Sequence, residues 1–310
     1  MQPASRSNTS IERHESTETV VSLLRTLLFV SGARPEMLAK ARGLRADAIV
    51  LDLEDSVPAD EKLRARDLVR AAVVPVAKAA KQAWVRVNST YTLLAKDDCR
   101  AVVMPELTGI LLPKADSPEI VRYADALLRD AEALNGVEPG ATRVIAHIES
   151  ASALLRAEAI SRASERIVAL AFGGEDYTAD MRIERTPGGG ELAYARSLIA
   201  VVSRAAGIMA IDTVYPYLHD LEGLLHDAAE AKRAGYQGKL LIHPEQVEPV
   251  ARLFTPKDEE LDNARRIVEA YDRASAEGRG AVQVDGVMVD APVAKRARQM
   301  LELFETAKLP

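Results

Sequence analysis

Residues 143–149 read R-V-I-A-H-I-E, and residues 167–176 read I-V-A-L-A-F-G-G-E-D. Each stretch is a short apolar run that ends in carboxylates, and a segment of helical period at residues 151–162 separates the two runs. Short runs rich in Val, Ile and Leu that alternate with helical segments are typical of repeated βα units. The two stretches therefore predict neighbouring parallel strands with acidic residues at their carboxyl ends.

The same alternation continues through most of the chain. It predicts eight strands, at residues 27–31, 48–53, 83–88, 109–113, 143–148, 167–172, 209–214 and 239–243. Helices are expected between most of them, at residues 36–42, 61–81, 118–134, 151–162, 191–206 and 221–234. Eight units in about 220 residues favour a closed (β/α)₈ TIM barrel over an open doubly wound sheet, so the predicted fold class is α/β.

Two segments lie outside the expected barrel, which spans residues 23–256. Residues 1–22 are rich in Ser, Thr and Glu without an apolar period, and they predict a disordered tail. Residues 257–310 predict a helix-hairpin-helix extension: a long helix at 257–278, strands at 281–284 and 287–289 joined by Asp-Gly, and a final helix from Pro292.

Composition excludes several classes of function. The 310 residues carry 40 Lys and Arg against 46 Asp and Glu, with no basic stripe, so nucleic acid is not an expected partner. Cys99 is the only cysteine, which excludes an intramolecular disulfide and fits a reducing compartment. No apolar run is long enough to span a bilayer, and Glu12, Glu15 and Glu18 oppose a signal peptide. We therefore expect no membrane partner and a cytoplasmic location.

Charged residues follow four of the expected strands: Asp52, Glu54 and Asp55 after the second, Arg86 with Asn88 at the third, Glu149 after the fifth, and Glu175 with Asp176 after the sixth. The carboxyl ends of TIM-barrel strands meet at one mouth, so we expect these side chains to share a cavity. Two carboxylates from adjacent strands suit Mg²⁺, which keeps waters and substrate oxygens in its shell, and Glu149 and Asp176 are the predicted ligands. The alternative is that each acid is a helix cap or first-turn residue.

Three other features also call for an explanation. Arg86 stands between two valines in an expected central strand, so its guanidinium must meet a carboxylate or a ligand. His147 and His243 lie in or at the end of strands, and we expect both to be hydrogen-bonded structural residues. The glycines at residues 188–190 lack the strand and the Lys-Ser/Thr of a phosphate loop, and they predict a flexible loop that covers the substrate.

A series of short motifs, in a fixed order, adds to this pattern. They are L-F-V-S-G-A-R-P at 28–35, L-D-L-E-D-S-V at 51–57, V-R-V-N at 85–88, L-P-K at 112–114, I-E-S-A at 148–151, G-G-E-D at 173–176, E-L-A-Y-A-R-S at 191–197, I-D-T-V-Y at 211–215, D-L-E-G-L at 220–224 and K-L-L-I-H-P at 239–244. With this order and spacing the chain resembles the HpcH/HpaI aldolase and citrate lyase β-subunit family, particularly its malyl-CoA and citramalyl-CoA lyases.

The resemblance implies a trimeric or hexameric barrel in which Glu149 and Asp176 hold Mg²⁺ or Mn²⁺, and Arg86 binds the keto-acid and thioester oxygens. The stretch M-V-D-A-P-V at 288–293 looks like the family motif whose aspartate acts in acid–base catalysis. That aspartate acts from a neighbouring subunit, which gives the role to Asp290 and makes the extension a lid on the neighbour. The alternative is that Asp290 only caps the final helix.

Other charged residues are candidates for binding substrate or coenzyme A. Lys62, Arg66 and Lys114 are predicted to contact the CoA phosphates, and Glu54 and Asp55 lie with them at the expected mouth. Solvated surface charge explains each of the three cations nearly as well.

The function implied is a magnesium-dependent carbon–carbon lyase that splits a β-hydroxyacyl-CoA into an acyl-CoA and a 2-keto acid. One alternative is an aldolase of free hydroxy-keto acids, which the S-G-A at 31–33 disfavours because such enzymes have a histidine there. Others are a malyl-CoA thioesterase or malate synthase-like enzyme, and a non-catalytic acyl-CoA-binding barrel. Two departures from the family pattern, Ser150 in place of threonine and His147 in place of an apolar residue, bear on the choice of substrate.

Overall fold

The computed structural model describes residues 24–79 and 81–308, so the predicted N-terminal tail lies outside the described residues. Eight parallel strands close into a barrel in the order of the sequence, with β8 hydrogen-bonded to β1. The predicted TIM barrel is confirmed. Its strands are β1 (Thr26–Ser31), β2 (Ala48–Asp52), β3 (Gln82–Arg86), β4 (Gly109–Leu112), β5 (Arg143–Ile148), β6 (Ile167–Phe172), β7 (Met209–Asp212) and β8 (Gly238–Leu241).

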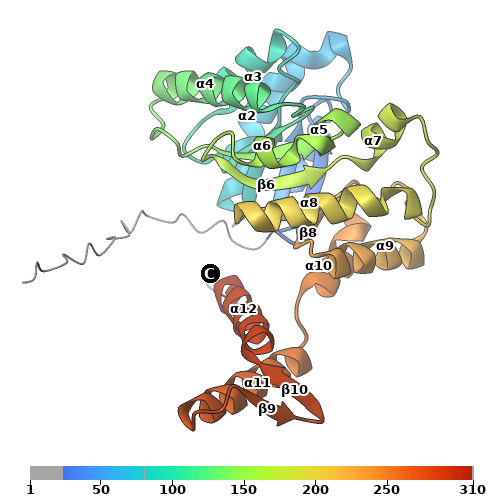
Figure 1. The fold of residues 1–310 in the computed structure, drawn as a ribbon. Helices are drawn as coiled ribbons and strands as arrows, with labels where there is room; N and C mark the ends of the chain where they lie inside the picture. The colour runs from blue at the N-terminus through green and yellow to red at the C-terminus, as the bar shows by residue number, and fades with distance from the viewer. Residues whose placement is uncertain (1–23, 80, 309–310) are drawn as a thin grey trace, which may run out of the picture.

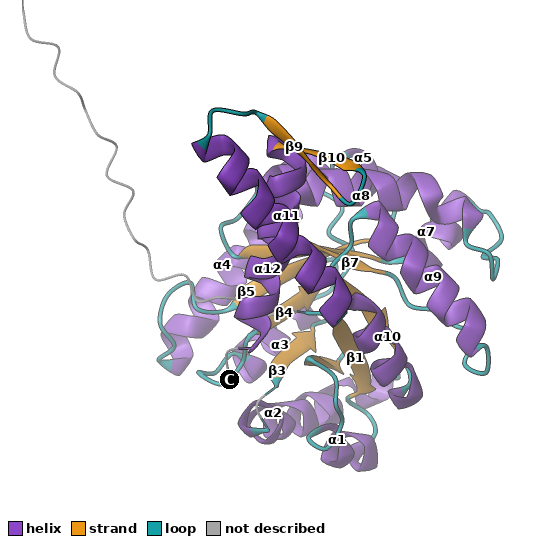
Figure 2. Cartoon of the chain, turned by 90° about the horizontal axis from the view of Figure 1, so that it is seen from below, coloured by secondary structure: helices purple, strands orange, loops and turns teal. Residues whose placement is uncertain are grey.

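Helices cover the outside of this barrel (Figures 1 and 2). They are α1 (Pro35–Ala41), α2 (Lys62–Lys78), α3 (Leu94–Val102), α4 (Pro118–Asn135), α5 (Ala151–Leu155), α6 (Ala157–Ser161), α7 (Gly174–Met181), α8 (Ala193–Ala206), α9 (Leu221–Ala234) and α10 (Val247–Phe254). The single helix expected at 151–162 is two short helices, because Arg156 leaves helical geometry with φ −109° and ψ 6°. No helix in the described residues is long and apolar enough to cross a membrane.

Alternate residues of each strand point to opposite sides of the barrel wall, which separates the core into two layers. The outer layer lies between strands and helices and holds most of the buried Val, Leu and Ala. The inner layer fills the barrel itself with Leu24, Leu27, Ala48, Val50, Trp84, Leu111, Ile145, Ala169, Ala171, Ile211 and Leu240. Because the interior is packed, a ligand has room only at the ends of the strands.

A buried ionic network lies in the outer layer between β7, β8, α8 and α9. Arg196 Nε donates to Asp212 Oδ1 at 2.9 Å, and its Nη2 donates to Asp227 Oδ1 at 2.6 Å. Lys239 Nζ donates to both carboxylates, at 2.5 and 2.6 Å. The two positive and two negative side chains balance, and all four carboxylate oxygens accept a hydrogen bond. We call these four residues the wall network.

The seam between β1 and β8 closes the barrel with very little space. A Cβ atom on Gly238 would lie 1.7 Å from the Leu24 carbonyl oxygen, so any other residue there would push the strands apart. Nearby, Arg25 Nη1 donates to Thr255 Oγ1 at 2.6 Å, a contact between residues 230 positions apart. The seam therefore depends on a glycine and joins the two ends of the barrel domain.

The C-terminal extension is α11 (Asp258–Ala276), β9 (Ala281–Val284), β10 (Val287–Asp290) and α12 (Ala291–Lys308). Its antiparallel hairpin is confirmed, and Asp285 and Gly286 at the turn have φ of 48° and 82°, as a two-residue hairpin turn requires. α11 packs on α12 and on both strands, and Figure 1 shows these elements standing apart from the barrel. The extension thus has a small core of its own.

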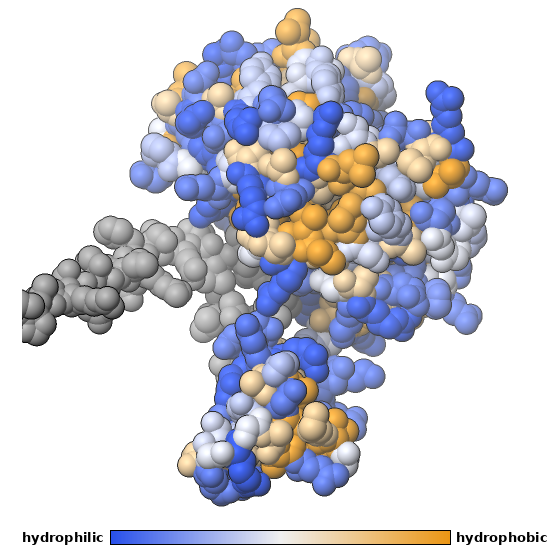
Figure 3. Space-filling view, viewed as in Figure 1, coloured by the Kyte–Doolittle hydropathy of each residue, from blue (hydrophilic) through white to orange (hydrophobic). Residues whose placement is uncertain are grey.

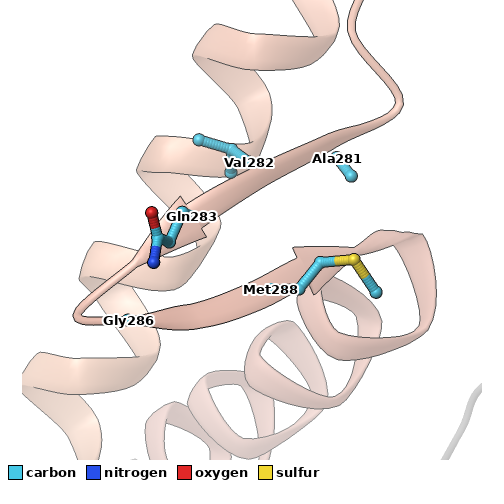
Figure 4. A pocket seen from close by; sticks show the side chains of 5 residues that line it. All are labelled: Ala281, Val282, Gln283, Gly286 and Met288. Carbon is cyan, nitrogen blue, oxygen red and sulfur yellow. The ribbon is translucent and has the colours of Figure 1, made fainter.

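Two surfaces stay apolar in this arrangement. Figure 3 shows one over α5 and α8, where Leu155, Tyr194 and Val201 are exposed, and one on the extension. On the extension, Val287 and Met288 of the hairpin are 63% and 67% exposed. A shallow pocket of about 320 Å³ lies along the hairpin, and Figure 4 shows the Met288 side chain beside it.

Candidate active site

A cavity of about 340 Å³ lies at the carboxyl ends of the barrel strands. Inward-pointing residues at the strand ends line much of it, as the period of two along each strand requires. They include Phe29 and Ser31 of β1, Asp52 of β2, Arg86 of β3, His147 of β5, and Gly173 and Thr213 just after β6 and β7. Asp55, Glu175 and Asp176 lie on its lining as well, so part of the expected set shares this cavity, whereas Glu54, Asn88 and Glu149 are not among its lining residues.

Arg86 is the central cation of the mouth. Its Nε and Nη2 donate to the two oxygens of Asp52, both at 2.7 Å, in a forked pair. Its Nη1 lies 3.2 Å from Glu54 Oε2 and 3.5 Å from Asp55 Oδ2, and the guanidinium stacks over the Phe29 ring at 4.7 Å. Burial opposes ionisation of Asp52, but the Arg86 charge and hydrogen bonds hold its pKa below the usual range. The arginine meets carboxylates, as its place in a buried strand predicted.

Glu54 and Lys114 form a second pair at the mouth, where Lys114 Nζ lies 2.6 Å from Glu54 Oε1. Burial is the main cause that raises the pKa of Glu54 to about 7. Arg86 and Lys114 act against this rise, and the nearby charges of Asp55 and Glu149 add to it. With Lys62, which also interacts with Asp52, Glu54 and Asp55, the mouth has three cations, and its acids still outnumber them.

Glu149 follows β5 and is 3% exposed. Its Oε2 accepts from the backbone N–H of Lys114 at 2.8 Å. Its Oε1 lies 2.5 Å from His147 Nδ1, yet among the described residues it has no partner with hydrogen-bond geometry. Burial opposes ionisation, but His147, the Lys114 N–H and Arg86 keep the pKa of Glu149 low. Gly173 makes room for this side chain, since a Cβ atom there would lie 2.5 Å from Glu149 Cγ.

Asp176 enters the cavity from the first turn of α7. Burial raises the pKa of this carboxyl, and the charges of Glu149 and Asp55 raise it further. Mutual repulsion between partly buried carboxylates is what a bound cation relieves. The described residues contain no group of three or more His, Cys, Asp or Glu that could hold a metal. Two carboxylates, one of them with an unpaired buried oxygen, still fit Mg²⁺, which takes few protein ligands and keeps several waters.

The other predicted site residues lie around this cavity in different roles. Lys62 Nζ donates to the carbonyl oxygens of Leu53 and Glu54, both at 2.7 Å, and so holds the turn after β2. Arg66 is buried, and its Nε donates to Asp98 Oδ1 at 2.8 Å. Asp98 Oδ2 in turn accepts from Asn88, so this group fastens the mouth of β3 to α2 and α3.

Asp290 ends the hairpin of the extension, where its Oδ1 accepts from the backbone N–H of Val293 at 3.2 Å. It caps α12 in this way and does not line the cavity of its own barrel. His243 accepts from the N–H of Glu245 at 3.3 Å, so the expected structural role is confirmed for this histidine. His147 lines the cavity, and neither of its nitrogens has a partner with hydrogen-bond geometry among the described residues, so its role stays a prediction.

Sequence reasoning missed several residues at the mouth. Gly173 and Gly174 were read only as part of a motif, although both allow close contact, and the N–H of Gly174 donates to Thr213 Oγ1 at 2.8 Å. Phe29 lies in an expected strand and in the first motif, with no site role predicted for it. Counting every second residue back from the charged strand ends would have placed Phe29 and Thr213 on the inner face.

The closed barrel and its polar mouth define the class, a (β/α)₈-barrel enzyme with its site at the carboxyl ends of the strands. Within this class, the sequence profile described as HpcH/HpaI aldolase/citrate lyase matches residues 25–244. The chain belongs to this family, and it is a lyase, as predicted.

Known proteins resemble the chain over most of its length. The citrate lyase subunit beta of Escherichia coli (strain K12) is 41% identical over 281 residues, which cover 91% of this chain and 93% of the relative. The mitochondrial citramalyl-CoA lyase of Homo sapiens is 30% identical over 295 residues, which cover 92% and 86%. A solved structure, protein CitE from Mycobacterium tuberculosis in complex with magnesium, acetoacetate and coenzyme A, matches with a TM-score of 0.73 and 30% identity. The match covers 91% of this chain and 98% of that chain.

Proposed function

We propose that the protein is a magnesium-dependent lyase that splits a β-hydroxyacyl-CoA into an acyl-CoA and a 2-keto acid. The observation that carries this proposal is the position of Arg86 in one cavity with Asp176, beside the buried Glu149 with its unpaired Oε1. The similar CitE structure, with magnesium, acetoacetate and coenzyme A bound, supports the same chemistry.

The cleavage requires three events at the substrate. The hydroxyl loses its proton, the adjacent carbon–carbon bond breaks to give the keto carbonyl, and the electron pair passes to the thioester as an enolate. A bound Mg²⁺ would supply Lewis-acid polarisation of the substrate oxygens, held by Glu149 and Asp176. Arg86 Nη1 faces Glu54 and Asp55 at longer range than the forked pair with Asp52. We therefore assign Arg86 Nη1 to stabilising the negative charge that develops on the substrate oxygens.

The enolate must then gain a proton at carbon, and we assign this transfer to Asp290 of a neighbouring subunit. Within one chain Asp290 lies on the extension, outside the cavity lining. The exposed apolar residues of the hairpin and of α8 support association between copies of the chain, because surfaces of this kind mark protein contacts; the trimer or hexamer is what the family resemblance implies. Asp290 then enters the site with the hairpin of the adjacent copy.

We assign the coenzyme A moiety to the rim that carries Lys62 and Lys114. The Lys114 side chain is 37% exposed while it pairs with Glu54, so its ammonium group is open to a phosphate. Glu54 and Asp55 keep Lys114 and Arg86 in place. Arg66 is the weakest of the three predicted cations, because its side chain is only 11% exposed and already pairs with Asp98.

The direct test is an assay of the purified protein with malyl-CoA, citramalyl-CoA and citryl-CoA, with and without Mg²⁺. Release of a 2-keto acid from one of these thioesters, only with the cation, is the expected result. Release of coenzyme A without a keto acid would favour a thioesterase, and cleavage of free hydroxy-keto acids alone would favour an aldolase. Binding of the thioesters with no product from any of them would contradict the proposed lyase.

Mixing of variants tests the contribution of the neighbour. Asp290→Ala should lower turnover by about 10²–10⁴, the range for one positioned proton-transfer group, without weakening Mg²⁺ binding. Arg86→Ala subunits should be inactive too. Mixed oligomers of the two variants contain sites with both groups intact, so activity should return. No recovery after verified subunit exchange would exclude catalysis between subunits.

A further inference from the structure

We propose that His147 is a positioning residue that orients Glu149 toward the cation, an inference that rests on the metal site of the proposed function. His147 lies on β5, two residues before Glu149, so both side chains point into the barrel mouth. The side chains of His147 and Glu149 are 6% and 3% exposed, and Nδ1 and Oε1 are 2.5 Å apart. Water therefore does not separate them.

The ring nitrogens of His147 have no alternative hydrogen-bond partner among the described residues. Neither Nδ1 nor Nε2 has a partner with hydrogen-bond geometry among the described residues. A buried ring N–H without an acceptor loses its hydration and gains nothing in return. The nearest acceptor is Glu149 Oε1, and a small rotation of the ring would turn this close contact into a direct hydrogen bond.

Such a hydrogen bond would fix the carboxylate at both ends. Oε2 is already held by the backbone N–H of Lys114 at 2.8 Å. If His147 Nδ1–H donates to Glu149 Oε1, the two hydrogen bonds together fix the plane of the carboxylate. Oε1 then keeps its second lone pair for the cation. A metal ligand that a hydrogen-bonding partner orients binds the metal more tightly, because the ligand loses less conformational freedom when the metal binds.

Packing prevents the pair from turning away. A Cβ atom at position 173 would lie 3.0 Å from His147 Nε2 and 2.5 Å from Glu149 Cγ, so both side chains lie against the bare backbone of Gly173. The ring is thereby held beside Glu149, at the wall of the cavity. An imidazole at this point serves better as a donor than as a ligand, because Mg²⁺ prefers oxygen.

The test compares two amides in the full-length protein by calorimetric titration with Mg²⁺ alone. Asn places an amide N–H where Nδ1 lies, whereas Gln places one where Nε2 lies. His147→Asn should bind Mg²⁺ within about threefold of the unchanged protein, while His147→Gln and His147→Leu should bind about 10–100-fold more weakly, the usual effect of losing such a partner. Thr26→Val is the matched control, because Thr26 is fully buried at the other end of the barrel and accepts from Asp47 N. It should lower the melting temperature and leave the Mg²⁺ affinity unchanged.

The outcomes separate this inference from the function on which it rests. If the unchanged protein binds no Mg²⁺, the proposed metal site is wrong. If the unchanged protein binds Mg²⁺ and Glu149→Gln abolishes binding, the proposed metal site is supported. The Mg²⁺ affinities of the His147 variants then test the positioning role of the histidine. Equal affinities for His147→Asn and His147→Gln would overturn the inference, and this comparison remains available if His147→Leu does not fold. A loss of melting temperature in all three variants with constant affinity would show a purely structural histidine.

Discussion

The barrel contains two buried ionic groups that differ in balance. In the wall network, Arg196 and Lys239 meet Asp212 and Asp227, and every carboxylate oxygen accepts a hydrogen bond. In the mouth cluster, which we define as Asp52, Glu54, Asp55, Lys62, Arg86, Lys114, Glu149 and Asp176, five acids face three cations. The wall network keeps the pKa of Asp227 low, whereas the mouth raises the pKa of Glu54 and of Asp176. The wall network, in which the charges balance, stabilises the fold. The mouth cluster, which has an excess of acids, can still bind a cation.

Lys239→Met should have the largest effect on stability. The substitution leaves Asp212 and Asp227 with Arg196 as their only cation, in a place where both carboxylates are fully or almost fully buried. Removing one partner of a buried ionic group costs about 3–5 kcal/mol. Urea denaturation would measure this loss in the free energy of unfolding, and a change under 1 kcal/mol would mean that the network is not needed for the fold.

Arg86→Lys should damage the mouth in a different way. The charge is kept, but the forked pair with Asp52 and the contact of Nη1 with Glu54 are lost. Turnover should fall by about 10²–10³, the range for one lost oxyanion donor, with a smaller loss of stability. Arg196→Lys is the matched control in the wall network, where stability should fall and the turnover of the folded protein should persist. Equal losses of turnover in Arg86→Lys and Arg196→Lys would contradict the distinction between a catalytic mouth cluster and a structural wall network.

Magnesium should stabilise the protein through the mouth alone. At a concentration 100 times the dissociation constant, a cation that binds only the native state adds about 2.7 kcal/mol to the free energy of unfolding. Thermal melts with increasing MgCl₂ should therefore shift upward, and Asp176→Asn should remove most of the shift. A shift that persists in Asp176→Asn would place the cation elsewhere.

A pH dependence of stability is also expected, and it comes from Glu54. Its pKa rises from 4.5 to about 7 on folding, so the native state binds the proton more tightly than the unfolded chain. Stability from this group is present at pH 4.5 and is lost as the pH rises through 7. In EDTA, Glu54→Gln should make the free energy of unfolding less dependent on pH between 5 and 8. An unchanged slope would show that Glu54 ionises normally.

The strands could be predicted because each is a short run of mostly apolar residues, and the mouth because charges follow those runs. The wall network could not be predicted, since its four residues, Arg196, Asp212, Asp227 and Lys239, are spread over more than forty residues, and no single segment shows which charges pair. The surroundings of His147 could not be predicted for the same reason. They depend on how a ring on β5 lies against the Glu149 carboxylate and against Gly173 just after β6, and periodicity does not describe such contacts.

The seam at Gly238 has a consequence for how the chain reaches its fold. β1 pairs with β2 early in synthesis, but its other edge has no partner until β8 has left the ribosome, and contacts between such distant residues form slowly. An unpaired strand edge is a site for aggregation during that interval. Gly238→Ala should therefore reduce the yield of soluble protein and slow refolding from urea. Normal yield and refolding would show that closure tolerates a side chain. Selection for glycine at position 238 would therefore shorten the time that the nascent chain spends with β1 and β8 unpaired.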